Sequence, residues 1–319
     1  MKTTQADAAG LAAAVLALRS GALVALPTET VYGLGALARN ESALKRVFEV
    51  KGRPGDHPLI VHLPDASMLE QWVLDVTEPA LALGAAFWPG PLTLLLRRHP
   101  SVLDIVTGGR PTVGLRIPDH EVALEVLRCC GDGVAAPSAN RFGAVSPTRA
   151  EHVIRDIGDR LDPARDVVLD GGPCAVGLES TIVDLTTPMP TILRPGAVTA
   201  EAIEAVLDTR VHRTDYGPSR APGMLAAHYA PRCEVLVARG GIEADTLAAS
   251  RRSCGQTVGV LSFDDLDEFA RRLYGALREA DDQRLDTVVV VVPPATGIGV
   301  AIVDRLTRAA TGSARRSAP

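Results

Sequence analysis

The chain is poor in aromatic residues, with five Phe, two Trp and four Tyr in 319 residues. Its core must therefore be built mainly from Ala, Val, Leu and Ile. Apolar residues make up 46% and charged residues 22%, a balance that is typical of folded domains and excludes wholesale disorder. At roughly 100–200 residues per domain, the length predicts two domains or one large one.

The chain also lacks an excess of positive charge. Its 33 Lys and Arg residues are outnumbered by 38 Asp and Glu residues, and the formal net charge is −5. This balance excludes a strongly basic protein that coats nucleic acid, but it leaves room for a local basic patch. Lysine is the rare cation, because only Lys2, Lys45 and Lys51 occur, and each is therefore a candidate functional residue.

Cysteine supplies no metal or disulfide framework. The five cysteines form no C-x-x-C pair and their number is odd, which favours reduced and mostly buried thiols. No apolar run reaches the ~18 residues that a bilayer span needs, and the N-terminus lacks the layout of a signal peptide. The sequence therefore predicts a cytoplasmic protein that does not contact membranes.

Short apolar runs alternate with helical patterns through the first 200 residues. Helices are predicted at 8–19, 42–50 and 121–130. Strands are predicted at 22–26, 59–63, 92–96, 113–117, 134–136, 167–170 and 181–185, the last two joined by a glycine-rich connection. This alternation predicts an α/β domain.

Residues 208–232 differ from what precedes them, with three prolines, several turn signals and little apolar periodicity, which predicts a linker. Beyond it, predicted strands alternate with predicted helices and indicate a small βαβ unit with a parallel sheet. The strands are at 234–237, 257–261 and 287–292, and the helices at 241–252, 264–280 and 299–310. The predicted organisation is thus a domain over 1–205, a linker over 206–232 and a domain over 233–319.

Two turns after predicted strands carry groups suited to an anion. The run PTETVYGLG at 27–35 offers two threonine hydroxyls, a carboxylate and two glycines, although a tight turn with an N-capping threonine is the competing interpretation. Lys51 and Arg53 can clamp a phosphate as a point charge and a bidentate fork, and the alternative is a solvated loop. His62 lies near the end of an apolar strand, where a lone histidine is more often a core residue than a ligand.

Later turns add hydroxyl groups, an amide and a guanidinium. Ser138, Asn140 and Ser146 follow a predicted strand and can hydrogen-bond a ribose or phosphate, or else only cap turns. Ser180 and Arg194 also lie at strand ends. No Walker A, dinucleotide-binding, G-x-S-x-G or H-E-x-x-H pattern occurs. The residues indicate an anion site without an obvious nucleophile, which fits nucleotidyl transfer but does not single it out.

Seven motifs stand in a fixed order along the chain: PTETVYGLG, KGRPGDHPLIVH, WPGPLTLLL, VGLRIPDH, PSANRFGAVSPT, GLESTIVD and LRPG. In this order they resemble the YrdC-like family and, within it, the long-form threonylcarbamoyl-AMP synthases. The resemblance covers 1–205 strongly, and the linker's PGM and HYAP with the C-terminal unit resemble the extra domain of the long form. It implies a YrdC-like twisted mixed-sheet catalytic domain and a smaller Rossmann-like βαβ C-terminal domain.

The resemblance implies an L-threonylcarbamoyladenylate synthase, which makes threonylcarbamoyl-AMP and pyrophosphate from L-threonine, bicarbonate or CO2, and ATP carrying Mg²⁺. The product would supply tRNA threonylcarbamoyl-transferase proteins that modify the adenosine next to the anticodon. Attack of a carbamate on the α-phosphate needs positioned cations and donors rather than a protein nucleophile.

Two other functions compete with this one. A double-stranded RNA-binding module, with weak binding of tRNA, is the alternative because YrdC-like domains carry a basic concave face. The net charge of −5 argues against tight general binding of RNA. A carbamoyl-transfer role like that of hydrogenase maturation proteins ranks last, because no zinc-binding Cys cluster is visible.

The resemblance also implies roles for individual residues. Those expected around the threonine are Thr30, His62, Arg116 and Ser180, with Arg116 at its carboxylate. Those expected to bind ATP are Lys51, Arg53, His57, Thr112, Ser138, Asn140, Ser146, Arg194 and Tyr229, of which Lys51 and Arg53 are also the expected catalytic groups. The linker, through Tyr229, is expected to close over the nucleotide as a lid, and no residue is expected to ligate a metal. Two positions depart from the family pattern: His57 stands where Asn is common, and the linker reads PGMLAAHYAP where a Lys-Tyr pair often follows the Met.

Overall fold

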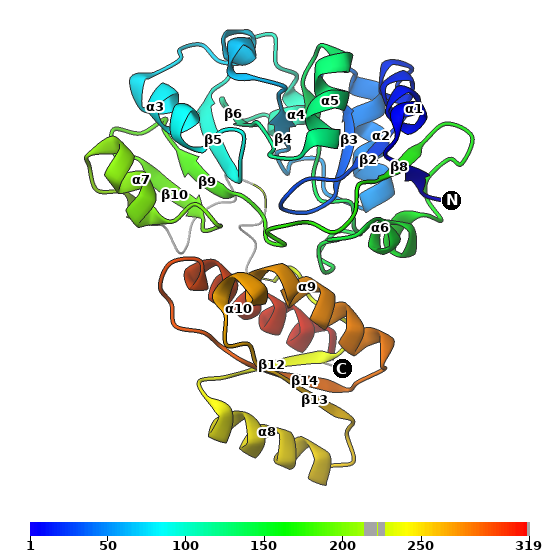
Figure 1. Ribbon diagram of the computed structural model, residues 1–319, viewed down its shortest axis with the longest axis vertical. Coiled ribbons are helices and arrows are strands. Elements are labelled where there is room, and N and C mark those ends of the chain that lie inside the picture. The colour runs from blue at the N-terminus through cyan, green and yellow to red at the C-terminus, as the bar shows by residue number, and fades with distance from the viewer. Residues whose placement is uncertain (214–221, 223–226, 318–319) are drawn as a thin grey trace.

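The computed structural model in Figure 1 describes residues 1–213, 222 and 227–317, with side chains described to residue 314. The described chain builds two separate sheets. The larger has 11 strands in the order β1-β8-β2-β3-β7-β4-β6-β5-β9-β10-β11, and the smaller has 3 strands in the order β12-β14-β13. Neither order follows the sequence, so the chain crosses over repeatedly in both.

The first domain consists of the large sheet and the helices that cover it. Its strands are β1 (Thr4–Gln5), β2 (Val24–Leu26), β3 (Gly33–Leu37), β4 (Ile60–His62), β5 (Leu92–Arg97), β6 (Thr112–Arg116), β7 (Val134–Ala135), β8 (Val167–Asp170), β9 (Thr181–Asp184), β10 (Thr191–Arg194) and β11 (His212–Arg213). Its helices are α1 (Ala8–Arg19), α2 (Glu41–Lys51), the 3₁₀ helix η1 (Ala66–Gln71), α3 (Glu78–Phe87), α4 (Asp104–Thr107), α5 (Glu121–Cys130), α6 (Ala150–Ile157) and α7 (Ala200–Leu207). β4 and β6 pair in parallel, whereas β5 and β6 pair antiparallel, so the sheet is mixed.

The local sequence of helix α2 explains where the helix begins and ends and why Lys51 is buried. The Asn40 side chain accepts a hydrogen bond from the Ala43 amide and begins the helix, and Gly52 ends it in the left-handed conformation at φ 62°. Leu44, Val47 and Lys51 fall on its buried face. Lys51 therefore points into the protein at the last turn of the helix.

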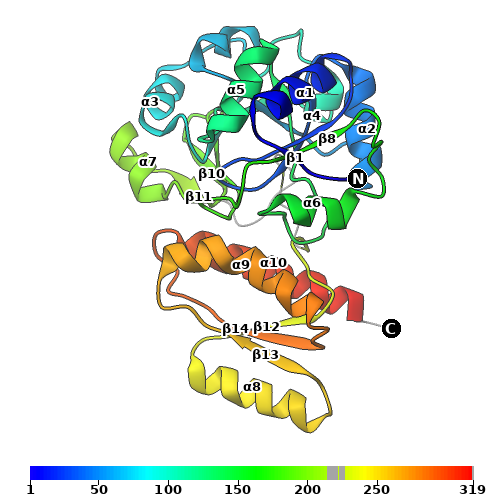
Figure 2. The ribbon, with the colours of Figure 1, turned by 45° about the vertical axis from the view of Figure 1, so that its right-hand side comes forward.

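The second domain alternates strands and helices. Its strands are β12 (Glu234–Ala238), β13 (Val258–Leu261) and β14 (Thr287–Val291), and its helices are α8 (Gly241–Ser253), α9 (Leu266–Asp282) and α10 (Gly299–Ser317). Both β12 and β13 pair in parallel with the central β14. Helices α9 and α10 lie between this sheet and the first domain, and α8 covers the far face, as Figures 1 and 2 show.

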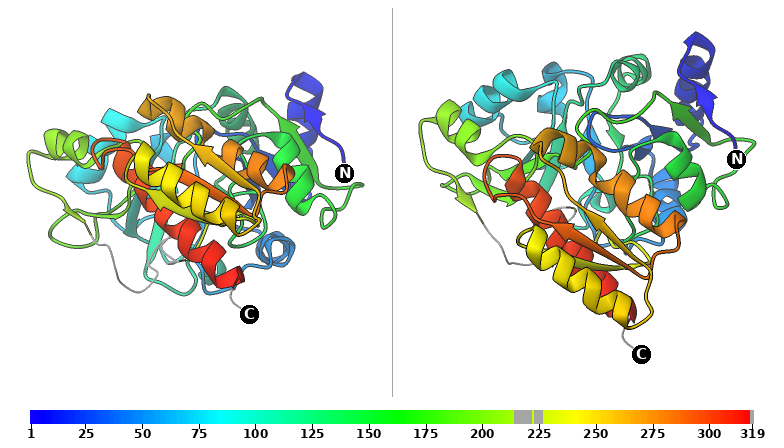
Figure 3. Two further views of the ribbon diagram at one scale, coloured as in Figure 1. Left: turned by 90° about the horizontal axis from the view of Figure 1, so that it is seen from below. Right: turned by 60° about the horizontal axis from the view of Figure 1, so that its bottom comes forward.

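The two domains share an apolar cluster. Val31, Val145 and Leu178 of the first domain pack with Leu273 and Leu277 of α9. A Cβ atom at Gly177, where φ is +79°, would lie 2.6 Å from the Arg271 Cα of α9, so glycine lets the two backbones approach. Figure 3 shows the second domain packed against one side of the first. The two domains are therefore packed closely against each other.

The observed fold confirms the predicted class, an α/β protein with a mixed sheet and a smaller parallel βαβ unit. Several elements were not predicted, namely the strands β1, β3, β10 and β11 and the helices η1, α3, α4, α6 and α7. The consecutive strands β8 and β9 are not neighbours in the sheet. β8 pairs with β1 and β2, and β9 pairs with β5 and β10, because partner choice depends on packing that a local pattern does not contain.

Part of the predicted linker lies in the first sheet, since β11 pairs in parallel with β10. Four of the ten residues of PGMLAAHYAP, residues 223–226, lie outside the described residues. Across the described helices, none combines the length and the hydropathy that crossing a bilayer requires.

Candidate active site

A pocket lies on the first domain where the linker crosses it. Its empty volume is about 580 Å³. It is lined by loop residues, strand residues and described linker residues, namely Thr28, Thr30, Val31, Gly33, Arg53, Ile60, His62, Arg116, Ala136, Pro137, Ser138, Glu179, Ser180, Arg194, Pro222, His228 and Tyr229. Residues from six of the seven motifs thus meet at one pocket.

Side chains on one face of the strands β4 and β6 form the floor of this pocket, because successive residues of a strand point to opposite faces of the sheet. Ile60 and His62 of β4 point to one face of the sheet, whereas Val61 between them belongs to the main core on the other face. Arg116 of β6 is the register partner of His62, so it points to the same face as His62. The pocket floor is therefore built on rigid strands.

Arg116 organises one end of the pocket. Its Nη1 donates to Thr30 Oγ1 at 2.8 Å and its Nε donates to the Gly90 carbonyl at 3.2 Å. Its Nη2 lies 2.6 Å from Glu29 Oε2, which is an ion pair by distance but not a hydrogen bond by geometry. The guanidinium is therefore fixed beside a hydroxyl, as recognition of a small amino acid's carboxylate requires.

Ser180 and Arg194 organise a second side. Arg194 donates from Nε to the Ser180 carbonyl and from Nη2 to Ser180 Oγ, both at 3.0 Å. Ser180 Oγ also lies 2.7 Å from Thr93 Oγ1 on β5. Gly196 is required here, because a Cβ atom on it would lie 2.3 Å from the Thr181 amide nitrogen. These contacts hold a hydroxyl and a guanidinium at the pocket wall.

Arg53 and Arg194 bring positive charge that no carboxylate balances directly. Arg53 is 9% exposed and Arg194 is 4% exposed, and within the described part of the chain neither forms an ion pair. The Arg53 Nε has no hydrogen-bond partner there, while its Nη2 donates to the Pro58 carbonyl at 2.9 Å. Burial lowers the pKa of Arg53 to about 10, with Tyr229 opposing the shift and Arg194 adding to it. Two buried guanidinium groups with unused capacity favour an anionic ligand.

Lys51 lies behind the pocket rather than in its lining. Its Nζ donates to the carbonyls of Ser138 and Asn140, the latter at 2.6 Å, and lies 3.4 Å from Asn140 Oδ1. Burial lowers the pKa of Lys51 well below its usual value, Arg53 adds to the shift, and Asp156 opposes it. Lys51 therefore braces the loop that carries Ser138 and Asn140.

Glu179 links the pocket to the second domain. Its carboxylate accepts hydrogen bonds from Ser146 Oγ at 2.6 Å, from Tyr274 Oη at 2.8 Å and from Arg305 Nε at 2.8 Å. Burial by itself raises the pKa of this carboxyl, but Arg305 and Arg194 outweigh it and bring the pKa down to about 2. Glu179 is therefore an ionised, fully satisfied group where the two domains meet.

Two histidines of the pocket are neutral. Burial lowers the pKa of His62 and of His228 to about 3 each, and nearby guanidinium groups add to both shifts. The Nδ1 atoms of both rings have no hydrogen-bond partner within the described residues. Tyr229 packs beside His228, stacks on Tyr274 at 5.6 Å between ring centroids, and has Arg305 over its ring.

The structure brings together many of the predicted site residues. All four predicted threonine contacts, Thr30, His62, Arg116 and Ser180, line the pocket. Of the predicted ATP contacts, four line it as well, namely Arg53, Ser138, Arg194 and Tyr229.

Other predicted ATP contacts lie outside the lining. Asn140 and Ser146 are in the loop behind it, where Asn140 accepts from Ser138 Oγ and Ser146 donates to Glu179. His57 packs edge-on against Phe142 with 5.3 Å between ring centroids. Thr112 begins β6, four residues from Arg116, or about 13 Å along the strand.

Several pocket residues were not predicted. Thr28 and Glu179 belong to recognised motifs, and His228 directly precedes Tyr229. These segments were therefore recognised from the sequence, but no role was predicted for the three residues. Arg305 has no local signal, because its contact with Glu179 joins residues 126 positions apart. Only the packing of α10 against the first domain reveals it.

Two family models match this chain. The model for Sua5, YciO and YrdC proteins, described as "Telomere recombination", matches residues 16–196. A model described as "Threonylcarbamoyl-AMP synthase, C-terminal domain" matches residues 198–311. Together they account for both sheets of the structure.

Relatives of similar length are named as threonylcarbamoyl-AMP synthases. A threonylcarbamoyl-AMP synthase of Pyrococcus abyssi is 41% identical over 314 residues, covering 92% of this chain and 91% of the relative. A threonylcarbamoyl-AMP synthase of Bacillus subtilis is 41% identical over 328 residues, covering 95% of this chain and 93% of the relative.

A solved structure shares the whole architecture. Pyrococcus abyssi Sua5, in a crystal structure complexed with L-threonine, superposes with a TM-score of 0.89 at 40% identity, covering 95% of this chain and 94% of that one. With both domains matched, the chain belongs to the Sua5/YciO/YrdC family, in the two-domain form that includes a threonylcarbamoyl-AMP synthase C-terminal domain.

Proposed function

We propose that this protein is an L-threonylcarbamoyladenylate synthase, which forms threonylcarbamoyl-AMP and pyrophosphate from L-threonine, bicarbonate or CO2, and ATP. The observation that carries the proposal is the pairing of Arg53 and Arg194, two buried guanidinium groups without a carboxylate partner, with the Arg116–Thr30 pair at the same pocket. An amino acid and a phosphate chain need these two kinds of contact side by side. The family's relatives are named for this activity.

The chemistry needs alignment rather than a protein nucleophile. The threonine amine adds to CO2 and loses a proton, which gives a carbamate. A carbamate oxygen attacks the α-phosphorus of ATP, and the bond from that phosphorus to the β-phosphate oxygen breaks as pyrophosphate leaves. Arg53 and Arg194 would offset the charge that crowds the phosphates, and Arg116 with Thr30 would hold the threonine.

Mg²⁺ enters this proposal as the partner of ATP. Across residues 1–213, 222 and 227–317, no group of three or more His, Cys, Asp or Glu side chains forms a metal-binding cluster. Glu179, the carboxylate in the described pocket lining, is already engaged by Ser146, Tyr274 and Arg305. The described residues therefore do not fit a protein-bound magnesium, and no step is assigned to the ion.

The reaction is tested directly with folded protein, ATP, Mg²⁺, bicarbonate and L-threonine. We expect pyrophosphate release that depends on threonine, together with threonylcarbamoyl-AMP detected by mass spectrometry. Release that is equal with and without threonine, from protein shown to be folded, would contradict the proposal.

Arg53→Met and Lys51→Met should each lower turnover by at least about 10-fold, since each removes a charge-assisted contact. The two variants should differ in which second property changes. Because Arg53 lines the pocket, its loss should in addition raise the KM for ATP. Loss of Lys51 leaves two loop carbonyls without their donor, so it should in addition lower the Tm.

Steady-state kinetics and thermal unfolding distinguish the two variants, with exposed Lys45→Met as the control. Wild-type turnover in both Arg53→Met and Lys51→Met would remove these residues from the proposed ATP site.

The proposal also concerns the proteins that use the reaction product. Threonylcarbamoyl-AMP is a reactive mixed anhydride, so a transferase that modifies tRNA should consume it. The double-stranded RNA-binding alternative gains less support, because the relatives that cover both domains are named as synthases. Weak binding of tRNA would add to the synthase activity rather than replace it.

A further inference from the structure

Three side chains of the second domain bond to the first domain at or beside the loop that carries the proposed nucleotide contacts: Arg278 reaches the loop itself, whereas Tyr274 and Arg305 bond to Glu179. Tyr274 and Arg278 stand one helical turn apart on the buried face of α9, and Arg305 is on the buried face of α10. The loop, residues 138–146, runs from Ser138 at the pocket to Ser146 beside Glu179. It is termed the 138–146 loop below. Its two ends are held in different ways.

The first end of the 138–146 loop is held from within its own domain. Lys51 donates to the Ser138 and Asn140 carbonyls, and Asn140 Nδ2 donates to the Ala144 carbonyl at 2.8 Å. The linker adds one backbone contact, in which the Ala230 amide donates to the Gly143 carbonyl at 3.1 Å. None of these contacts fixes Val145 or Ser146.

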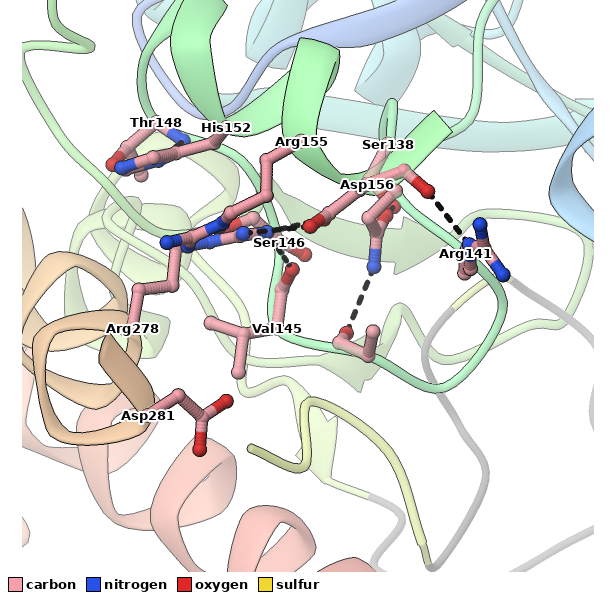
Figure 4. Close-up of polar contacts among 12 residues, drawn as sticks. Ser138, Arg141, Val145, Ser146, Thr148, His152, Arg155, Asp156, Arg278 and Asp281 are labelled. Atoms are coloured by element: carbon pink, nitrogen blue, oxygen red, sulfur yellow. Dashed lines mark hydrogen bonds and ion pairs between the residues drawn. The ribbon is translucent and has the colours of Figure 1, made fainter. Parts of the chain in front are cut away.

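The backbone carbonyls of the last two residues of the loop are held by Arg278, while the Ser146 hydroxyl donates to Glu179. Arg278 Nη2 donates to the Val145 carbonyl, and Arg278 Nε lies 3.4 Å from the Ser146 carbonyl. The same guanidinium forms two bonds to Asp156 of α6, from Nη1 to Oδ1 at 2.9 Å and from Nη2 to Oδ2 at 2.6 Å. Figure 4 shows Arg278 reaching between Val145 and Asp156. One buried fork therefore joins α9, α6 and the loop.

A second arginine crosses the same interface without touching the loop. Arg155 Nη1 lies 2.6 Å and 2.7 Å from the two Asp282 carboxylate oxygens, again between α6 and α9. The side chains of that pair are 40% and 60% exposed, whereas those of Arg278 and Asp156 are 5% and 14% exposed. Exposed ion pairs contribute little to a fold, and buried ones fix geometry. Arg155 is therefore a matched control for Arg278, because its ion pair joins the same two helices but is exposed.

We propose that Arg278 is a positioning residue for ATP binding, through which the second domain sets the backbone at Val145 and Ser146 and completes the nucleotide side of the pocket. The inference rests on the proposed synthase function, because it assigns the nucleotide to the 138–146 loop. The threonine side does not contact Arg278: His62 and Arg116 stand on the paired strands β4 and β6, and Arg116 donates to Thr30. Loss of Arg278 should therefore affect the two substrates unequally.

The test compares Arg278→Met, Arg278→Lys and Arg155→Met in the full chain. Arg278→Met should raise the KM for ATP by about 10-fold or more, while the KM for threonine stays within about 2-fold. Arg278→Lys keeps the charge but not the fork, so it should fall between wild type and Arg278→Met. Arg155→Met should leave both KM values within about 2-fold of wild type.

Hydrogen exchange of the backbone amides in residues 138–146, measured without substrates, gives a readout that does not depend on activity. Arg278→Met should exchange faster there, and Arg155→Met should match wild type. Unchanged exchange in Arg278→Met, equal changes in both KM values, or the same effects from Arg155→Met would each overturn the proposal. An inactive wild type with the expected exchange pattern would instead contradict the synthase function and leave the loop contact established.

Discussion

Glu179→Gln should lower the free energy of unfolding by about 3 kcal/mol and should remove most of the synthase activity. The substitution keeps the shape of the side chain but removes the charge that pairs with Arg305, whose side chain is fully buried. Removing one partner of a buried ion pair costs about 3–5 kcal/mol. The lower end applies here because Arg305 keeps a second ion pair, with Asp304. Denaturant unfolding and pyrophosphate release measure the two effects.

The control for this variant is Glu268→Gln. Glu268 pairs with Arg272 one turn along α9, and both side chains are about half exposed. Removing its charge should change the free energy of unfolding by less than about 0.5 kcal/mol. A Glu179→Gln protein as stable and as active as this control would show that Glu179 does not hold the domains together.

The Glu179 effect depends on pH in a defined direction. The pKa of this carboxyl is lowered from an ordinary 4.5 to about 2 in the folded protein, so the unfolded chain binds the proton more readily. The stability that the charge provides is fully present above about pH 4.5 and disappears as the pH falls toward 2. The stability difference between wild type and Glu179→Gln should therefore be constant near neutral pH and shrink below about pH 4.5. A difference that grew on acidification would contradict the assigned direction.

Arg116→Met should weaken threonine binding by about 100-fold or more while ATP binding changes within about 3-fold. The variant loses the guanidinium that we propose meets the threonine carboxylate, a charge-assisted bidentate contact. It also leaves the buried Glu29 carboxylate without its cation, so that this group would repel the substrate's carboxylate. Calorimetric titration with threonine alone measures the loss.

The double variant Arg116→Met/Glu29→Gln separates these two causes. If repulsion by Glu29 contributes, the second change should recover part of the threonine affinity, and the double-mutant cycle gives its size. Arg128→Met, at an exposed pair on α5, is the matched control. Threonine affinity equal to wild type in a folded Arg116→Met protein would remove Arg116 from the site.

Much of the site was readable from local sequence. Motifs in predicted turns supplied Thr30, Arg53, Ser138 and Arg194, and the pocket contains all of them. The burial of Lys51 was not predicted, although Lys51 continues the apolar positions Leu44, Val47 and Phe48 at helical spacing. A lysine on the buried face of a helix reaches inward, and here it bonds to loop carbonyls.

The remainder of the site could not be predicted because it depends on contacts between distant segments. Nothing near Arg278 or Arg305 marks either residue as part of a site, yet each bonds to a group more than 100 positions away. The pairing of β8 and β9 with other strands rather than with each other is decided in the same way. Thr112, a predicted nucleotide contact, begins β6 and lies outside the pocket lining, whereas Arg116 at the other end of the strand lies in it.

The sequence by itself determined the helices and strands of both domains in outline, the anion-binding character of the turns, and the family. Each of these follows from side-chain periodicity, capping and turn chemistry within a few residues. The tertiary structure alone decided the order of the strands, the position of Lys51 behind the pocket, and the use of Glu179, Arg278 and Arg305 to join the domains. Such choices require packing between segments far apart in the chain, and packing is a property of the whole folded molecule rather than of any local pattern.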